Sequence, residues 1–376
     1  MLRDYTNHDE STLGLQEFMD LIKDFVNLLS APSTFFALVS AMLAVFLWKR
    51  EALTSNQVGC GVFGFLAAFF LFGMTDENFR LIVGKPDNVP ISALIFLLFF
   101  FTWYSIRQAV RNDRRLKEGK PPIEKDEEDR VWVWPDLVYT ELIALVLCTA
   151  ILIVWSIVLE APLEQPANAA NTPNPSKAPW YFLGLQEMLV YFDPWLAGVV
   201  LPTLIIVGLM AIPYIDRNPK GNGYFTFNER RSEITIFLFG FAVLWTSLIV
   251  LGTFLRGPNW NLFGPFEYWD IHKLEPLTNV QLSEYVWIRA LGTGLPSHWL
   301  IREMFGILLC IIYLGVLPVV LARTLFKTYL EKMGASRFYV GVFLFLMMLL
   351  LPIKMLTRWL FNLKYVVSIP EFFFNI

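Results

Sequence analysis

Long apolar runs separated by shorter polar segments dominate the pattern of this chain. Eight of these runs could cross a bilayer, which takes about 20 apolar residues. They cover residues 32–48, 58–74, 90–106, 137–159, 194–214, 234–255, 303–322 and 338–360, of which the second and third are the shortest. The pattern therefore predicts an all-α integral membrane protein with about eight transmembrane helices.

Two further segments have helical character without being spans. Residues 11–29 place apolar side chains at helical spacing, with acidic residues and Lys23 between them. This predicts an amphipathic helix that lies on the membrane surface or against a partner. Residues 179–193 begin with Pro179, which suits a first helical turn, and end at Asp193-Pro194. They are too few to cross a bilayer, so we expect a short interfacial helix in an outer loop.

The composition indicates a membrane protein and argues against a nucleic-acid partner. Of the 376 residues, 56% are hydrophobic and 17% charged, which is too apolar for an ordinary soluble fold. The net charge of −3 argues against a nucleic-acid partner, because a polyanion binder needs clustered Lys and Arg without compensating acids.

The basic residues predict the topology. The loop 107–136 holds eight Lys and Arg, so by the positive-inside rule it is expected in the cytoplasm, together with the loops 215–233 and 323–337. The loop 160–193, in which Lys177 is the single basic residue, is expected outside. An even number of spans also places both termini and the loop 256–302 outside.

The stretch 111–130 carries mixed charges and is interrupted by prolines, so we expect it to be a linker that does not pack into a core. It divides the chain into modules. In order, these are an N-terminal amphipathic surface segment (1–30), a three-helix N-terminal membrane module (31–110), the charged cytoplasmic linker (111–130), a second membrane module (131–256), an outer aromatic loop (257–302) and two C-terminal transmembrane helices (303–376).

The cysteines and histidines, which are the usual ligands of redox metals, do not form a metal-binding pattern in this sequence. The three cysteines fall within predicted spans and are interpreted as small apolar residues: Cys60, Cys148 and Cys310. The three histidines fall outside the predicted spans: His8, His272 and His298. A membrane haem with two axial histidines therefore cannot be built from this chain alone. The spacings of covalent haem, iron–sulfur and zinc sites are absent as well, so we expect no metal ligand in this chain.

The predicted short helix carries the candidate site. Five prolines from Pro162 to Pro179 favour a semi-rigid path into this helix. On the helix, one face is shared by Trp180, Gly184, Glu187 and Tyr191, and Gln186 is adjacent. One carboxylate and one amide thus lie among aromatic and apolar groups, an arrangement that suits a quinone head group.

Two interpretations of Glu187 are open. Burial among apolar groups disfavours the charged form of a carboxyl, which suits Glu187 to accept and release protons. Alternatively, Glu187 caps a neighbouring backbone or pairs with an arginine of a partner.

Residues 131–256 resemble the C-terminal half of cytochrome b, which stands as the separate subunit IV in chloroplast-type cytochrome bc complexes. The matching features are Pro135 and Glu141 at the start of a span, the proline-rich outer loop PLEQPANAANTPNP, the segment APWYFLGLQE at the position of the family's Pro-Glu-Trp-Tyr motif, and PYIDRNPKG after the next span. Trp180 and Tyr181 match the motif directly. The motif glutamate, which the family uses to accept a quinol proton, is replaced by Pro179, and Glu187 is the candidate replacement.

The resemblance implies a non-haem, subunit IV-like component of a bacterial quinol:cytochrome c oxidoreductase in the cytoplasmic (inner) membrane, inert on its own. This chain would form part of an outer-side quinol-oxidation pocket. The candidate quinone-binding residues are Pro179, Trp180, Tyr181, Leu183, Gln186 and Glu187, with Glu187 as the candidate proton acceptor.

Quinol or quinone would bind at a shared site, and no cofactor would be held covalently by this chain. The b haems, a Rieske iron–sulfur cluster and a cytochrome c haem are expected in partner subunits, namely a haem-bearing cytochrome b N-terminal subunit, a Rieske protein and a c-type cytochrome. Membrane lipids surround the spans.

Two other classes of function are open. One is a structural scaffold of a respiratory assembly whose quinone site has degenerated. The other is a transporter with a discontinuous helix at its binding site. The transporter is less favoured because few charged residues fall within the spans, where transport pathways usually place them.

Overall fold

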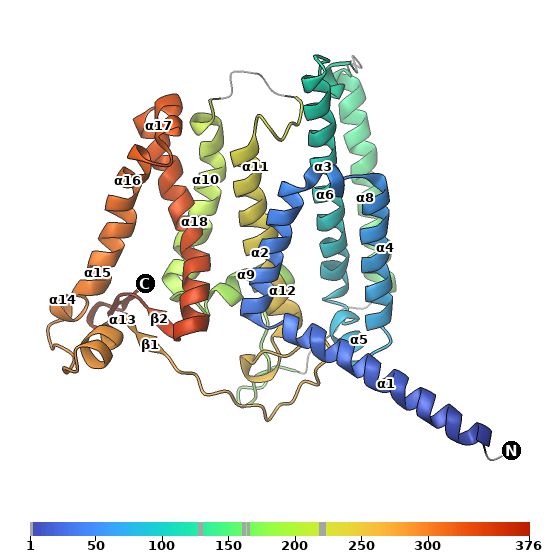
Figure 1. Cartoon of the computed structure of the whole chain (residues 1–376), viewed down its shortest axis with the longest axis horizontal. Coiled ribbons are helices and arrows are strands. Elements are labelled where there is room, and N and C mark those ends of the chain that lie inside the picture. The colour runs from blue at the N-terminus through green and yellow to red at the C-terminus, as the bar shows by residue number, and fades with distance from the viewer. Residues whose placement is uncertain (1–2, 127–130, 160–162, 164–165, 218–222) are drawn as a thin grey trace.

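The computed structural model describes residues 3–126, 131–159, 163, 166–217 and 223–376. Most of these residues lie in helices (Figure 1). Among the described residues, seven helical segments are long and apolar enough to cross a membrane. They are α4 (Asn56–Gly73), α6 (Val89–Lys117), Val133–Val158 with α8 (Val138–Val158), Leu196–Ile215 with α10 (Leu201–Ile215), Arg231–Leu255 with α11 (Arg231–Leu238) and α12 (Thr246–Val250), Met304–Arg323 with α15 (Met304–Ile311) and α16 (Leu317–Arg323), and α18 (Ala335–Phe361).

A bent pair of helices makes an eighth span if its two parts count together. Residues Gln16–Leu29 of α1 (Arg3–Leu29) meet α2 (Pro32–Trp48) at 84°. The prediction of an all-α membrane protein with about eight spans is confirmed.

Shorter helices connect the spans: α3 (Arg50–Leu53), α5 (Glu77–Val83), α7 (Ile123–Asp126), α9 (Trp180–Met188), α13 (Leu282–Glu284), α14 (Trp299–Arg302) and α17 (Lys327–Met333). Local side chains fix several starts. Ser55 accepts a hydrogen bond from the backbone N–H of Val58 at the start of α4, and Asp76 accepts one from Phe79 at the start of α5.

The described residues contain four very short strands. Three of them lie in the C-terminal segment, and the fourth, β1, pairs with one of these. β1 (Val280–Gln281) pairs in parallel with β2 (Leu363–Tyr365), and β3 (Ser368–Ile369) pairs antiparallel with β4 (Phe374–Asn375). In register, Val280 faces Leu363 and Ser368 faces Asn375. These pairs join the C-terminal segment to the outer loop before α13 and fold the last residues back on themselves.

Helix α1 begins near the N-terminus, and its first turns extend away from the body of the molecule (Figure 1). Its C-terminal turns are fixed by an ion pair between Lys23 and Asp76, 2.8 Å apart, and by the Asn27 side chain, which accepts a hydrogen bond from the Phe266 N–H. Four of its apolar side chains are exposed along one side of the helix: Phe18, Leu21, Phe25 and Leu28. The predicted amphipathic helix is thus present, and it begins earlier than expected, at Arg3.

The loops lie at two opposite ends of the molecule. In Figure 1, α17, the last turns of α10, the first turns of α11 and the far end of α6 lie at one end. Helix α9, β1, α13 and both termini lie toward the opposite end. The basic loops are thus gathered at one end and the proline-rich loop at the other, which agrees with the alternation expected from the charges.

The largest buried cluster joins helices from distant parts of the chain. It contains residues of α2, of α9 and the turn after it, of the spans Leu196–Ile215 and Arg231–Leu255, and of α18: Phe36, Met188, Tyr191, Phe192, Leu196, Ala197, Leu201, Val243, Leu244, Leu248, Met347, Leu351 and Met355. Helix α18, beyond the segment that resembles cytochrome b, thus packs against the same core as α9.

The expectation that the charged stretch 111–130 does not pack is wrong for its first part. Helix α6 continues to Lys117, and Asn112 is fully buried. The Asn112 amide donates to the Glu124 carboxylate at 2.8 Å and to the Phe225 carbonyl oxygen at 3.0 Å. Burial of the Asn112 amide is tolerated because these partners satisfy its hydrogen bonds. Residues 127–130 lie outside the described residues.

Candidate functional site

Helix α9 follows the proline-rich loop and packs on the C-terminal end of the span Arg231–Leu255. Two glycines permit close contact. A Cβ on Gly184 would lie 3.4 Å from Trp245 and Ile249, and one on Gly252 would lie 3.2 Å from the Leu183 carbonyl oxygen. The helix covers Trp180–Met188 with Pro179 as its N-cap, so it is shorter than the predicted 179–193. The backbone leaves the helix in turns well before Pro194.

A buried ion pair lies beneath α9. The Glu187 carboxylate accepts hydrogen bonds from Arg256 Nη2 at 2.7 Å and from Arg256 Nε at 2.9 Å. The exposed fraction is 0% for Glu187 and 8% for Arg256. Arg256 Nη1 donates to the Trp260 carbonyl oxygen at 2.7 Å, and the Tyr191 hydroxyl lies 3.4 Å from Glu187 Oε1. Two parallel hydrogen bonds of this kind are among the stronger polar contacts in proteins.

The pKa values of Arg256 and of the neighbouring Tyr191 are shifted at this ion pair. Burial works against the charged form of Arg256, but the charge and hydrogen bonds of Glu187 outweigh it, so the pKa of Arg256 is raised. Burial, and then the Glu187 charge, raise the pKa of the Tyr191 hydroxyl. The structure therefore favours a charged Arg256 and a neutral Tyr191 beside the carboxylate.

The predicted face of the short helix is present in part. Gly184, Glu187 and Tyr191 are buried together, as the helical spacing predicted, whereas Trp180 at the start of the helix is partly exposed. The surroundings of Glu187 match the second interpretation of the sequence, with the difference that the arginine belongs to the same chain. The role of Glu187 as a proton acceptor stays a prediction.

Gln186 fastens the proline-rich loop to α9. Its Nε2 donates to the Ser176 carbonyl oxygen at 2.9 Å, and its Oε1 accepts from the Ala178 N–H at 2.8 Å. Both polar atoms of the Gln186 amide are therefore bonded to the loop backbone. The contacts give Gln186 a clear task in holding the residues just before Pro179 in place.

The proline-rich loop is attached to the loop that follows Leu255. Asn174 and Asn259 exchange two hydrogen bonds: Asn174 Nδ2 donates to Asn259 Oδ1 at 2.9 Å, and the Asn259 N–H donates to Asn174 Oδ1 at 2.6 Å. Lys177 Nζ donates to the Thr253 carbonyl oxygen at 2.9 Å and lies 4.9 Å from the centre of the Trp269 ring. Sequence reasoning missed Arg256, Asn174 and Lys177. The single signal for Lys177 was its isolation as the one basic residue of its loop.

Apart from Gln186, which bonds to the loop backbone, the candidate quinone-binding residues divide into two groups. Pro179, Trp180 and Tyr181 are exposed, with exposed fractions of 36% for Trp180 and 53% for Tyr181. Phe182, which was not among the candidates, is exposed to 51%, and its ring lies 4.8 Å from that of Tyr181. Leu183 and Glu187 point into the protein. The outward group forms an aromatic surface, and the inward group supports it.

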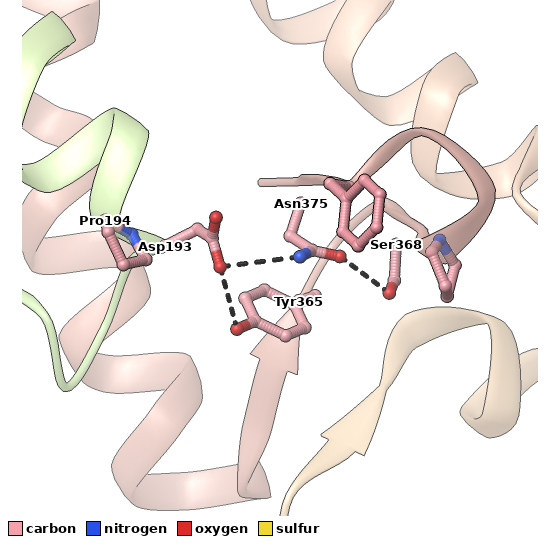
Figure 2. A pocket seen from close by; sticks show the side chains of 7 residues that line it. Asp193, Pro194, Tyr365, Ser368 and Asn375 are labelled. Atoms are coloured by element: carbon pink, nitrogen blue, oxygen red, sulfur yellow. Dashed lines mark hydrogen bonds between the residues drawn. The ribbon is translucent and has the colours of Figure 1, made fainter.

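A cavity of about 480 Å³ lies just beyond α9, where Asp193 and Pro194 meet the C-terminal segment. Figure 2 shows Asp193 facing Tyr365 and Asn375 there, and Asn375 facing Ser368. Asp193 Oδ1 accepts from the Tyr365 hydroxyl at 3.2 Å and from Asn375 Nδ2 at 3.4 Å. Burial, and then the nearby Asp193, raise the pKa of Tyr365. The candidate quinone-binding residues do not line this cavity, which instead marks where the C-terminus is attached.

Comparison with known proteins adds a family to this geometry. Residues 166–265 match the family model described as cytochrome b (C-terminal)/b6/petD. No solved structure matches the chain significantly. The matched residues contain the proline-rich loop, α9, the ion pair and the outer loop through Pro265, so they contain the contacts that fix the aromatic surface. Over residues 166–265, about a quarter of its length, the chain is therefore similar to the cytochrome b (C-terminal)/b6/petD family.

Proposed function

We propose that this chain is the non-haem membrane subunit of a bacterial quinol:cytochrome c oxidoreductase and forms one wall of its outer-side quinol-oxidation pocket. The observation that carries the proposal is the aromatic surface of Pro179, Trp180 and Tyr181, exposed on a helix within a cytochrome b C-terminal-type domain. A partner subunit would supply the facing wall.

The surface suits this task because it is rigid. Gln186 holds the backbone just before Pro179, and Asn174 ties the loop to Asn259. Flat aromatic side chains offer a quinone ring stacking area, and fixed positions lower the cost of ordering them on binding. Phe182 adds to the same surface.

The electron carriers would belong to partner subunits. The spans contain no histidine, because His8 precedes them and His272 and His298 lie in the outer loop. The b haems would be held by a cytochrome b N-terminal subunit, and the iron–sulfur cluster and c-type haem by a Rieske protein and a cytochrome. The chemistry left to this chain is to bind and orient the quinol, exclude water and take up protons.

The buried ion pair gives one specific reason to keep the scaffold as a second candidate. If Glu187 serves only to hold Arg256, and the motif glutamate is absent at Pro179, the aromatic surface could be a docking face without turnover. The two candidates differ in whether an assembly that contains this chain oxidises quinol.

The test is mild purification of the chain with its partners from its native membrane. A reduced-minus-oxidised spectrum and a quinol:cytochrome c assay would follow. We expect copurified b-type haem and turnover that falls when Tyr181 is changed to Ala, with Tyr268→Ala as an exposed aromatic control in the outer loop. A haem-free preparation that retains its partners, or a haem-bearing one without quinol oxidation, would reject the oxidoreductase role and leave the scaffold.

A further inference from the structure

Lys177 is fixed in position within the proline-rich loop. The Gln186 amide bonds to the backbone on both sides of it, at Ser176 and at Ala178. The side chain is half-buried and runs inward, where Nζ donates to the Thr253 carbonyl oxygen at 2.9 Å. A long flexible side chain is thus held in one place, two residues before Pro179.

The charges around Lys177 disfavour its ammonium form. Lys85, between α5 and α6, and Arg256 are cations that act on it, and Glu187 on α9 is the carboxylate that opposes them. Both oxygens of Glu187 are already bonded to Arg256. Burial, and then the two cations, lower the pKa of Lys177 to about 7. A substantial share of neutral amine is therefore present at neutral pH, unlike at an exposed lysine.

The two residues that Lys177 contacts each carry a buried polar atom without a hydrogen-bond partner among the described residues. These atoms are Thr253 Oγ1 and Trp269 Nε1. Buried polar groups of this kind normally bond to ordered water when no protein partner is present. The Lys177 amine, together with the hydroxyl and the indole N–H of the two residues it contacts, supplies both donors and acceptors, which is what a water-filled proton path requires.

We propose that Lys177 takes up a proton that leaves the quinol in the outer pocket and passes it, through water held at Thr253 and Trp269, to the outer side. The inference rests on the proposed function. It gives the proton-accepting task to Lys177 instead of Glu187, because both oxygens of Glu187 already accept hydrogen bonds from Arg256, and a proton on either oxygen would face a guanidinium N–H.

The proton and electron balance is simple. The O–H bond of one quinol hydroxyl breaks, and the proton bonds to the lone pair of the neutral Lys177 amine, which becomes an ammonium group. The second hydroxyl proton leaves to water. The two electrons would pass to one-electron carriers of partner subunits, for which the proposed function names an iron–sulfur cluster and a b-type haem, and quinone would remain. The ammonium group then returns its proton to outer water, which restores the neutral amine.

Two substitutions separate proton uptake from positioning. Lys177→Arg keeps a cation that can reach the Thr253 carbonyl oxygen, but a guanidinium does not lose its proton. Lys177→Met removes both properties. In the purified complex we expect both variants to lower kcat at neutral pH on the order of 10²-fold, with unchanged haem content. The wild-type rate should rise with pH through about 7, because the base form is the active one, and neither variant should show that rise.

Lys85 offers an independent test from outside the site. Its cation helps to lower the pKa of Lys177, so Lys85→Met should move the rise in rate to higher pH and leave the maximal rate unchanged.

The outcomes are distinguishable. If the wild-type complex does not oxidise quinol, the proposed function fails and the inference with it. If the wild type turns over and Lys177→Arg retains both the rate and its pH profile, Lys177 only positions the loop. An unshifted profile in Lys85→Met would likewise overturn the assignment.

Discussion

Both oxygens of the Glu187 carboxylate accept hydrogen bonds from Arg256, and the remaining guanidinium nitrogen donates to the Trp260 carbonyl oxygen. Two opposite charges taken out of water are tolerated when their hydrogen bonds are satisfied in this way. Loss of one partner leaves the other as an unpaired buried charge. The pair therefore constrains which substitutions at this site the fold can accept.

A double-mutant cycle measures this coupling. Glu187→Gln and Arg256→Met should each lower the free energy of unfolding by about 3–5 kcal/mol, because each leaves one partner uncompensated. The double variant should lose clearly less than the sum of the two. The measurement is the heat-unfolding midpoint of the complex in detergent. Strictly additive losses would show that the two groups act independently and would return Glu187 to consideration as a free proton acceptor.

Part of this site could be predicted from the sequence. The helical spacing placed Gly184, Glu187 and Tyr191 on one face, and they are buried together. Arg256 could not be found in the same way, because it lies 69 residues further along the chain and local periodicity carries no information on such a partner. The same holds for Lys177, whose properties come from Thr253, Trp269 and the surrounding charges.

The helical elements follow closely from hydrophobic pattern, since a run of apolar residues of bilayer length has few alternatives to a helix. The predicted span 338–360 lies within Ala335–Phe361, and 234–255 within Arg231–Leu255. Polar segments were predicted less well. The stretch after residue 110 has the composition of a linker, yet Asn112 and Asp113 are buried against residues 225–228, more than a hundred positions away.

A substitution at Asn112 therefore tests whether this polar contact holds the end of α6. Asn112→Ala removes the donor to Glu124 and to the Phe225 carbonyl oxygen, which we expect to cost about 1–3 kcal/mol. The segment Ile123–Asp126 should then be cleaved faster in limited proteolysis of the folded protein. Arg111→Ala, an exposed neighbour on the same helix, is the control and should leave the cleavage rate unchanged. Equal protection in the two variants would contradict a structural role for the Asn112 contacts.

At the scale of the whole molecule, the loops predicted to be cytoplasmic and helix α9 lie at opposite ends of one axis. The basic connections lie at one end of the helices, and α9 with the proline-rich loop lies at the other (Figure 1). The C-terminal segment is fastened at this second end as well, through Asp193, Tyr365 and Asn375 (Figure 2). Because helix α18 packs in the core with α9, the segments outside the matched family domain help to hold the aromatic surface.

The orientation of this axis in the membrane decides where quinol protons would be released, and cysteine labelling in intact cells can determine it. After replacement of Cys60, Cys148 and Cys310 by Ala, single cysteines would be introduced at exposed loop positions of the two ends: Lys120 and Leu325 at one, Asn171 and His272 at the other. Positive-inside bias predicts that a membrane-impermeant thiol reagent labels Asn171→Cys and His272→Cys at once. Lys120→Cys and Leu325→Cys should react only after lysis. The reverse pattern would put Lys177 and the aromatic surface on the cytoplasmic face, so that protons taken up by Lys177 could not reach the outer side.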